Sequence, residues 1–352
     1  MESTTRRSFI RTIGTTTVIA TSPLLLAKSK ALPAKQIVGQ GAHTYECNHD
    51  WGKLPEGASY GNASHGVTVD KQGLIFITHQ GKPGSIFVFD PKGEFIKSMA
   101  DFHTVKGTAK GHGIDIREEN GEEFIYLAAS DSNLDFAKMN TKGELVWRRG
   151  KAELHKHSGK YGGRARYRPT NISFAPNGGY FLGDGYGSSM IHQYDKDNNY
   201  VRTIGGGGTA DGKFRTPHGQ WLDDRDGTPK LVVADRANKR LQWFDMNGKH
   251  LKTMGGFLFP ADIDIQGDIM LVPDLHARVT LLDKDNKVIA QLGDDEAWRK
   301  RVLDKKERMR NSRPKWQATK FIHPHDACFD RDGNIFIAEW VAGGRVTKLR
   351  KV

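Results

Sequence analysis

The stretch "IFVFDPKGEFIKS", residues 86–98, sets the structural rhythm of this chain. An unbroken apolar run leads to Phe89 and Asp90, a polar turn with a glycine follows, and a shorter run with Phe95 and Ile96 completes the phrase. Apolar runs on both sides of such a turn predict two β-strands joined as a hairpin. Related phrases occupy residues 191–203, 241–253 and 279–291, with a weaker copy at 136–148. The chain is therefore expected to repeat one hairpin many times.

A second predicted hairpin precedes each of these, which gives six units of four short strands. The units begin at equivalent positions, which are His65, His112, Asn171, His218, Asp262 and His325. Their spacing is 44 to 63 residues, and repetition of this kind predicts an all-β fold, a six-bladed β-propeller. Two packed sheets are the alternative architecture, but six copies fit a ring better.

The ends of the chain are expected to close this ring. The sixth unit stops at Val352 after three strands, and "HTYECNHDW", residues 43–51, can supply the fourth strand and cover its edge. Cys47 would then lie in the outer strand and Cys328 in the innermost strand of one blade. Those strands are about 14 Å apart, beyond disulfide reach, so both cysteines are predicted to be free.

One segment, residues 294–320, breaks the rhythm because it is polar and strongly basic. It is predicted to be a helical insertion between the fifth and sixth blades. Trp298, Val302 and Met309 could lie against the propeller, although a solvated helix is the favoured interpretation and a lid over one face is a third.

The N-terminal residues 1–31 read as a targeting segment outside the fold. "TTRRSFIR", residues 4–11, precedes an apolar, Thr-rich run that is too short to cross a bilayer, and "SKA" follows at 29–31. This layout predicts a twin-arginine export signal cleaved near Ala31, with a short buried helix or a membrane anchor as alternatives. The domain 32–352 is then expected to be periplasmic or secreted, with no membrane partner.

The net charge of +12 includes four charges from this segment. No stripe of Lys and Arg alternates with aromatic residues, so no nucleic-acid partner is expected. A solvated basic surface is the favoured interpretation, and attraction to anionic glycans or acidic substrates is the functional alternative. A closed propeller is expected to be a monomer.

Histidines recur at the start of the innermost strands. Because His112, His218 and His325 belong to alternate blades, their imidazoles would converge near the channel axis. Three nitrogens with an open fourth position are typical of a catalytic zinc site, although iron, copper or manganese also fit, and a ring of hydrogen-bonded histidines is the alternative. The returning second strands would place another ring outside this one, made of His79, Asp131, Asp184, Asp235, Asp274 and Glu339.

Several motifs closely resemble peptidyl-α-hydroxyglycine α-amidating lyases, six-bladed propellers of the NHL type. The motifs are "GDGYGSSMIHQYD" (183–195), "FRTPHGQ" (214–220) and "VADRANKRLQWFD" (233–245), supported by "GHGIDI" (111–116) and "HPHDACFD" (323–330). That family cleaves the carbon–nitrogen bond of a C-terminal α-hydroxyglycine, releasing a peptide amide and glyoxylate. The resemblance therefore implies a small-molecule or peptide substrate for this chain. The resemblance implies a general base at Tyr186 and a cation at Arg236. The alternative for Tyr186 is an aromatic side chain packed at a loop, and the alternative for Arg236 is an ion pair with Asp184 or Asp235.

The resemblance also implies two metals. Zinc would be held by His112, His218 and His325, and a structural calcium by the carbonyls of Val67 and Ile114 with the carboxylate of Asp326.

The substrate pocket departs from the family. Gln80 stands where the family has an arginine that binds the substrate carboxylate, His323 replaces a methionine, and His65 is an additional ring histidine. These three residues are expected to contact an altered substrate. Arg164, Arg166 and Arg168 could supply a replacement cation, or they could form a solvated loop.

Two other functions stay open from the sequence. One is a non-catalytic NHL propeller that binds protein or glycan. The other is a calcium-dependent lactone hydrolase, for which only Asn171 and Asp262 of the ring offer suitable ligands.

Overall fold

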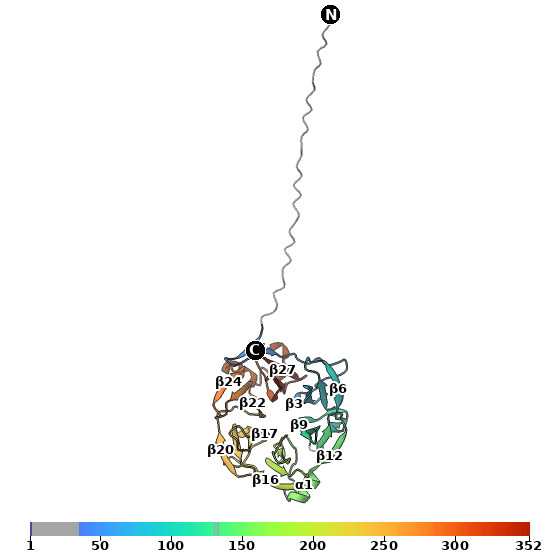
Figure 1. Ribbon diagram of the computed structural model, residues 1–352, viewed down its shortest axis with the longest axis vertical. Coiled ribbons are helices and arrows are strands. Elements are labelled where there is room, and N and C mark those ends of the chain that lie inside the picture. The colour runs from blue at the N-terminus through green and yellow to red at the C-terminus, as the bar shows by residue number, and fades with distance from the viewer. Residues whose placement is uncertain (2–34, 130, 132–133) are drawn as a thin grey trace. The chain divides into compact units, whose positions relative to one another are not determined.

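Six antiparallel β-sheets surround a central axis in the computed structural model, which describes Met1 and residues 35–129, 131 and 134–352. The strands β3, β9 and β17 lie towards the centre of the ring, and β6, β12, β16, β20 and β24 lie on its outside (Figure 1). The predicted six-bladed propeller is confirmed. The predicted export signal lies outside the described residues.

The first three blades follow one another along the chain, each with its strands in sequence order from the centre outward. Blade one contains β3 (Ser64–Val69), β4 (Ile75–His79), β5 (Ile86–Phe89) and β6 (Phe95–Met99). Blade two contains β9 (Gly111–Glu119), β10 (Glu122–Ala129), β11 (Phe136–Asn140) and β12 (Leu145–Arg149). Blade three contains β13 (Asn171–Phe174), β14 (Tyr180–Asp184), β15 (Met190–Tyr194) and β16 (Tyr200–Gly205).

The remaining blades continue the pattern. Blade four contains β17 (Pro217–Asp223), β18 (Lys230–Asp235), β19 (Arg240–Phe244) and β20 (His250–Met254). Blade five contains β21 (Asp264–Gln266), β22 (Ile269–Asp274), β23 (Arg278–Leu282) and β24 (Val288–Leu292). Blade six contains β25 (Pro324–Phe329), β26 (Ile335–Glu339), β27 (Arg345–Lys351), β2 (His43–Asn48) and β1 (Ile37–Gln40).

Blade six joins the two ends of the described chain, as predicted. Strand β2 pairs antiparallel with β27, with Cys47 opposite Leu349, and β1 adds a fifth strand outside β2. Cys47 lies in β2 and Cys328 in β25, and both are free, as expected.

The connections carry the short helices. The α-helices are α1 (Lys151–Ser158), between blades two and three, and α2 (Glu296–Leu303), between blades five and six. The 3₁₀ turns are η1 (Asp101–His103), η2 (Arg236–Asn238), η3 (Met309–Asn311) and η4 (Arg313–Lys315), and the strands β7 (Thr104–Val105) and β8 (Thr108–Ala109) form a small hairpin. Within the described ranges, none of the helices has the length and apolar character needed to cross a membrane.

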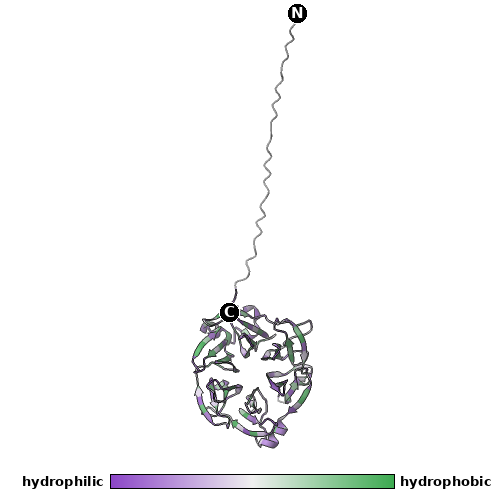
Figure 2. Ribbon diagram, viewed as in Figure 1, coloured by the Kyte–Doolittle hydropathy of each residue, from purple (hydrophilic) through white to green (hydrophobic). Residues whose placement is uncertain are grey.

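The core lies mainly between neighbouring blades, and Figure 2 shows apolar stretches (green) along the strands of the ring. One cluster, for example, joins Leu271 and Leu281 of blade five to Ile337 and Leu349 of blade six. Burial of such side chains provides the main driving force for folding. Each blade therefore depends on its two neighbours, and the ring holds the inner strand ends in fixed positions.

The insertion at 294–320 packs against the propeller. Trp298, Val302 and Met309 are buried together with Ile322 and Val341, and the Trp298 indole N–H donates to the Phe321 carbonyl at 2.7 Å. A wholly solvated helix, the favoured interpretation from the sequence, does not describe this segment.

Candidate functional site

Four histidines gather where the innermost strands begin. His65, His112, His218 and His325 start their strands and are each at most 4% exposed. The ring centroids of the three predicted ligands are 4.7–4.9 Å apart, so these imidazoles do converge. His65 joins them, with its centroid 4.6 Å from that of His325 and 5.0 Å from that of His112.

The closest group of nitrogens differs from the predicted one. Ring nitrogens of His65, His112 and His325 all lie within 4.8 Å of one another, and this buried cluster could hold a metal ion. His65, assigned to substrate binding from the sequence, therefore lies in the metal-competent group. His218 lies beside it, with its Nε2 2.9 Å from the Tyr186 hydroxyl.

The hydrogen bonds of these histidines prepare them as ligands. The Nδ1 atoms of His112, His218 and His325 lie 2.7, 2.6 and 3.1 Å from backbone carbonyls of Thr170, Ala261 and His65. A carbonyl only accepts, so Nδ1 carries the proton and Nε2 keeps its lone pair.

Unsatisfied polar atoms support the same conclusion. The Nε2 of His325 and both ring nitrogens of His65 are buried and have no hydrogen-bond partner in the described structure. Buried polar atoms normally find a partner, and borderline-soft divalent metals prefer imidazole nitrogen. The donor set therefore fits a transition metal.

The protonation state of the cluster fits metal binding as well. Burial lowers the pKa of all four histidines, to about 3 for His112, and the positive charge of Arg236 lowers them further. The imidazoles are thus neutral at physiological pH, which is the form that binds metal.

The glycine that follows three of these histidines has a packing role. A Cβ at Gly113 would lie 2.3 Å from the Thr170 carbonyl oxygen, and a Cβ at Gly219 would lie 2.1 Å from Oδ1 of Asp262. The next innermost strand lies directly against each glycine. The His-Gly pairs therefore combine a side chain aimed at the axis with a close approach between blades.

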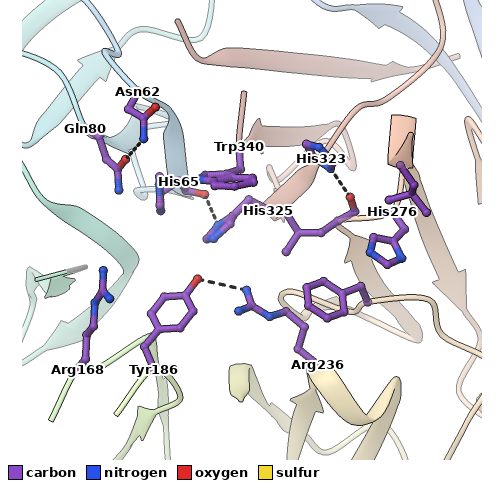
Figure 3. Close-up of a pocket in the computed structure, with 13 residues that line it drawn as sticks. Asn62, His65, Gln80, Arg168, Tyr186, Arg236, His276, His323, His325 and Trp340 are labelled. Carbon is purple, nitrogen blue, oxygen red and sulfur yellow. Dashed lines mark hydrogen bonds between the residues drawn. The ribbon is translucent and has the colours of Figure 1, made fainter. Parts of the chain in front are cut away.

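Tyr186 and Arg236 meet the histidines, as the sequence predicted for their positions. The Tyr186 hydroxyl accepts a hydrogen bond from Nη1 of Arg236 at 3.2 Å and lies 3.3 Å from Nε2 of His112 (Figure 3). The Arg236 guanidinium lies 5.1 Å from the Tyr186 ring centroid and 5.0 Å from that of Phe259. The Tyr186 hydroxyl is thus held between two imidazoles and the Arg236 guanidinium.

Buried carboxylates fix the loops on this face. Asp235 accepts from the Arg215 backbone N–H at 2.7 Å, and Glu339 accepts from that of Ile322 at 2.7 Å. An arginine of the third strand pairs with each acid of blades four to six, in the pairs Asp235–Arg240, Asp274–Arg278 and Glu339–Arg345. These residues of the predicted outer ring hold the fold rather than line the pocket.

A cavity of about 450 Å³ opens beside the histidines (Figure 3). Of the predicted site residues, it is lined by His65, Gln80, Tyr186, Arg236, His323 and His325. Gln80 accepts from the Asn62 side-chain amide at 3.1 Å, and Nδ1 of His323 donates to the Leu275 carbonyl at 2.6 Å. The predicted substrate-binding residues therefore share one pocket with the predicted base and cation.

The far wall of the pocket was missed from the sequence. It is lined by Phe259, Leu275, His276, Leu303 and Trp340. The rings of Phe259 and His276 stack at 4.9 Å with planes 6° apart. These residues lie on connections whose sequences carry no repeating pattern, and only the aromatic or apolar character of their side chains was available as a signal.

The residues of the predicted calcium site lie deeper in the channel. Asp326 is 4% exposed and interacts with Asp115, Asp262 and Asp264. Burial and mutual repulsion raise the pKa of Asp326 well above its usual value, and burial raises that of Asp262 to about 7. Val67 and Ile114 are buried in β3 and β9. Calcium binding by this group stays a prediction.

No protein-family model matches the chain. Among curated proteins, it is 33% identical over 91 residues to peptidyl-glycine alpha-amidating monooxygenase B of Xenopus laevis, and 33% identical over 82 residues to monooxygenase A. The first match covers 24% of this chain and 10% of that protein, and the second covers 22% and 9%. The chain thus spans about a tenth of these relatives.

Solved structures share the fold at low sequence identity. A streptogramin B lyase superposes with a TM-score of 0.53 at 12% identity, over 87% of this chain and 97% of that one. A catalytically inactive virginiamycin B lyase from Staphylococcus aureus, solved with Quinupristin, gives 0.54 at 12% identity over 88% and 100%. The architecture and the local similarity together identify the chain as a six-bladed β-propeller distantly related to the peptidyl-glycine α-amidating monooxygenases.

Proposed function

We propose that this protein is a metal-dependent lyase that cleaves a carbon–nitrogen bond in an α-hydroxylated substrate. The observation that carries the proposal is the position of the Tyr186 hydroxyl, which contacts Arg236 and two imidazoles of the buried histidine cluster. A pocket of about 450 Å³ gives a small molecule or the end of a peptide access to that point.

The metal would be held by His112 and His325 together with His218, as the family resemblance implies, or with His65, as the nitrogen distances favour. Zinc is the proposed ion, and another divalent transition metal fits the same donors. When bound, such an ion acts as a Lewis acid that makes a substrate hydroxyl easier to deprotonate.

The protein's own groups would move the proton. Tyr186, acting as its phenolate, would accept the proton of the substrate hydroxyl, while the Arg236 guanidinium stabilises the negative charge that passes from the phenolate to the substrate oxygen. As the hydroxyl oxygen forms a carbonyl with carbon, the carbon–nitrogen bond breaks. Its electron pair stays on nitrogen, which receives the proton, and the products are an amide and an aldehyde.

Further parts of the proposal rest on the sequence. Residues 1–31 act as a twin-arginine signal, so the mature protein works in the periplasm or outside the cell as a monomer. A calcium ion held by Asp326 and the carbonyls of Val67 and Ile114 supports the channel. The basic surface is proposed to attract an anionic glycan as a second partner.

The second candidate function is a non-catalytic NHL propeller that binds protein or glycan. The replacement of the family arginine by Gln80 favours it, because an amide offers no charge-assisted pair to a carboxylate.

Metal analysis and one tyrosine variant test the proposal. Tyr186→Phe should keep about one equivalent of metal and lose at least roughly 10²-fold in the release of glyoxylate from α-hydroxyglycyl peptides. Tyr200→Phe is the control, since its hydroxyl bonds Thr203 in an outer strand. Undiminished turnover in Tyr186→Phe would remove the assigned base. A protein that takes up no transition metal, or that takes it up and cleaves none of these peptides, would favour the binding function.

A further inference from the structure

The connection between blades two and three concentrates positive charge. Residues 148–168, "RRGKAELHKHSGKYGGRARYR", contain eight Lys or Arg residues and one acidic residue, Glu153. The segment thus carries +7 of the chain's net charge of +12. Like charges placed close together repel one another, and a bound anion would relieve that repulsion.

Part of this segment forms a groove, here called the basic groove. It has a volume of about 620 Å³ and is lined by Lys151, Arg164, Ala165, Arg166, Tyr167, Arg168 and Tyr186. No carboxylate is among these lining residues. Arg168 and Tyr186 also line the pocket beside the histidines, so the groove adjoins that pocket at the residue proposed as the base.

The backbone of the groove is held in place. The Arg168 N–H donates to Oδ1 of Asp184 at 2.6 Å, and the Arg166 carbonyl accepts from the Ser188 hydroxyl at 2.7 Å. Tyr167 is only 2% exposed, so its buried side chain anchors residues 164–168 to the propeller. The cationic wall is therefore built on fixed backbone.

Arg164, Arg166 and Arg168 alternate with Ala165 and Tyr167 along the chain. The three arginines are exposed, whereas Tyr167 is buried. In the described residues, Lys151, Arg164 and Arg166 take part in no ion pair with a protein carboxylate. The guanidinium of Arg168 lies 5.3 Å from the Tyr186 ring centroid, and Arg168 and Arg236 lie on either side of that ring in Figure 3. A line of cations thus runs outward from Tyr186.

We propose that the basic groove binds the acidic residues of a peptide substrate, on the N-terminal side of the residue that reacts at Tyr186. The inference rests on the proposed function, because the groove's occupant is taken to be the continuation of the substrate in the pocket. Arginine forms short, often bidentate hydrogen bonds with Asp and Glu carboxylates, and the groove offers Arg164, Arg166 and Lys151 for them.

The test is a binding measurement that needs neither metal nor turnover. A fluorescein-labelled peptide of eight glutamates is titrated with wild type, with Arg164→Ala/Arg166→Ala and with Lys249→Ala/Lys287→Ala. The last variant removes the same charge from exposed hairpin turns of blades four and five. We expect the arginine variant to bind at least tenfold more weakly and the lysine variant to bind within twofold of wild type.

Two results would overturn the proposal. The first is equal weakening of octaglutamate binding in both variants, or no binding by wild type. Equal weakening would mean that binding follows the net charge of the protein and not the groove. The other is tighter groove-dependent binding of an octamer of galacturonate, which would make the ligand a glycan. If octaglutamate binds through the groove while no α-hydroxyglycyl peptide is cleaved, the lyase function fails and the groove assignment stands. If cleavage occurs, Arg164→Ala/Arg166→Ala should raise KM for an acidic peptide more than it lowers kcat.

Discussion

Asp184 connects the proposed base to the basic groove. Its carboxylate accepts hydrogen bonds from the backbone N–H groups of Arg168 and Ser188 and from the Tyr161 hydroxyl, at 2.6 to 2.7 Å. In blades four to six the equivalent acid pairs with an arginine, but Asp184 has Tyr161 and through it His192. The loop that carries Tyr186 is therefore held by a buried carboxylate with no arginine of the third strand beside it.

This environment makes a pH-dependent prediction. Burial raises the pKa of Asp184 to about 6 from its usual 3.8, although its hydrogen bonds act in the opposite direction. A raised folded-state pKa means that the carboxyl stabilises the fold fully below about pH 4 and loses that contribution as the pH rises through about 6. Relative to Asp184→Asn, wild type should lose roughly 3 kcal/mol in free energy of unfolding between pH 4 and 7, measured with urea.

A matched control should show the opposite trend. Backbone and side-chain hydrogen bonds from Asn199 lower the pKa of Asp195 in an exposed turn. The contribution of Asp195 to the free energy of unfolding is therefore lost as the pH falls. The stability of wild type relative to Asp195→Asn should increase as the pH rises. A gap between wild type and Asp184→Asn that stays constant with pH would show that its carboxyl titrates normally.

Single residues were predictable where they repeat. The histidine positions, Tyr186 and Arg236 follow from strand rhythm and motifs, and the structure brings them together. The third member of the closest histidine triad was not predictable. His65 and His218 both lie beside His112 and His325, and only the direction of each side chain determines which of the two brings its nitrogens closest. Phe259 and His276 were missed, since an irregular loop gives no register from which to place a side chain.

At the scale of elements, β2 closes the ring by filling a site between β27 and β1. Tyr45 and Cys47 point into the core shared with blade five, and Glu46 between them points outward. Because Tyr45 is 2% exposed, Tyr45→Ala should lower the free energy of unfolding by about 3–5 kcal/mol. Thermal or urea unfolding measures the loss.

The neighbouring residue supplies the control for this strand. Glu46 forms ion pairs with Lys35 and Arg350 at the surface, and such pairs contribute little. Glu46→Ala should therefore cost under about 1 kcal/mol. Equal losses in the two variants would mean that β2 is held by its edge hydrogen bonds and ion pairs, not by the side chains that it buries.

The elements differ in how well the sequence foretold them. The alternation in residues 43–48 marks β2, and the incomplete sixth unit gives it a place. Strand β1 has four residues and buries only Val38, so its pattern is too short to recognise. The burial of the insertion at 294–320 depends on Ile322 and Val341, which lie outside it in the sequence.

At the scale of the molecule, the candidate ligands come from three different blades. His65, His112 and His325 belong to blades one, two and six, which are adjacent around the ring and meet where its first and last units join. A ligand shared by these blades would bind the closed ring and not the unfolded chain. Metal binding should therefore be coupled to the closure of the whole fold.

This coupling gives a prediction for the intact protein. Zinc at about 100 times its Kd should add roughly 2.7 kcal/mol to the free energy of unfolding and raise Tm by about 4 °C, as measured by calorimetry with and without chelator. His112→Ala/His325→Ala should abolish the shift, because every candidate triad loses two nitrogens. His155→Ala/His157→Ala removes two exposed histidines of α1 and should keep it. A shift that survives the first double variant would place the metal elsewhere on the protein, since nothing else in the cluster could then supply three imidazoles.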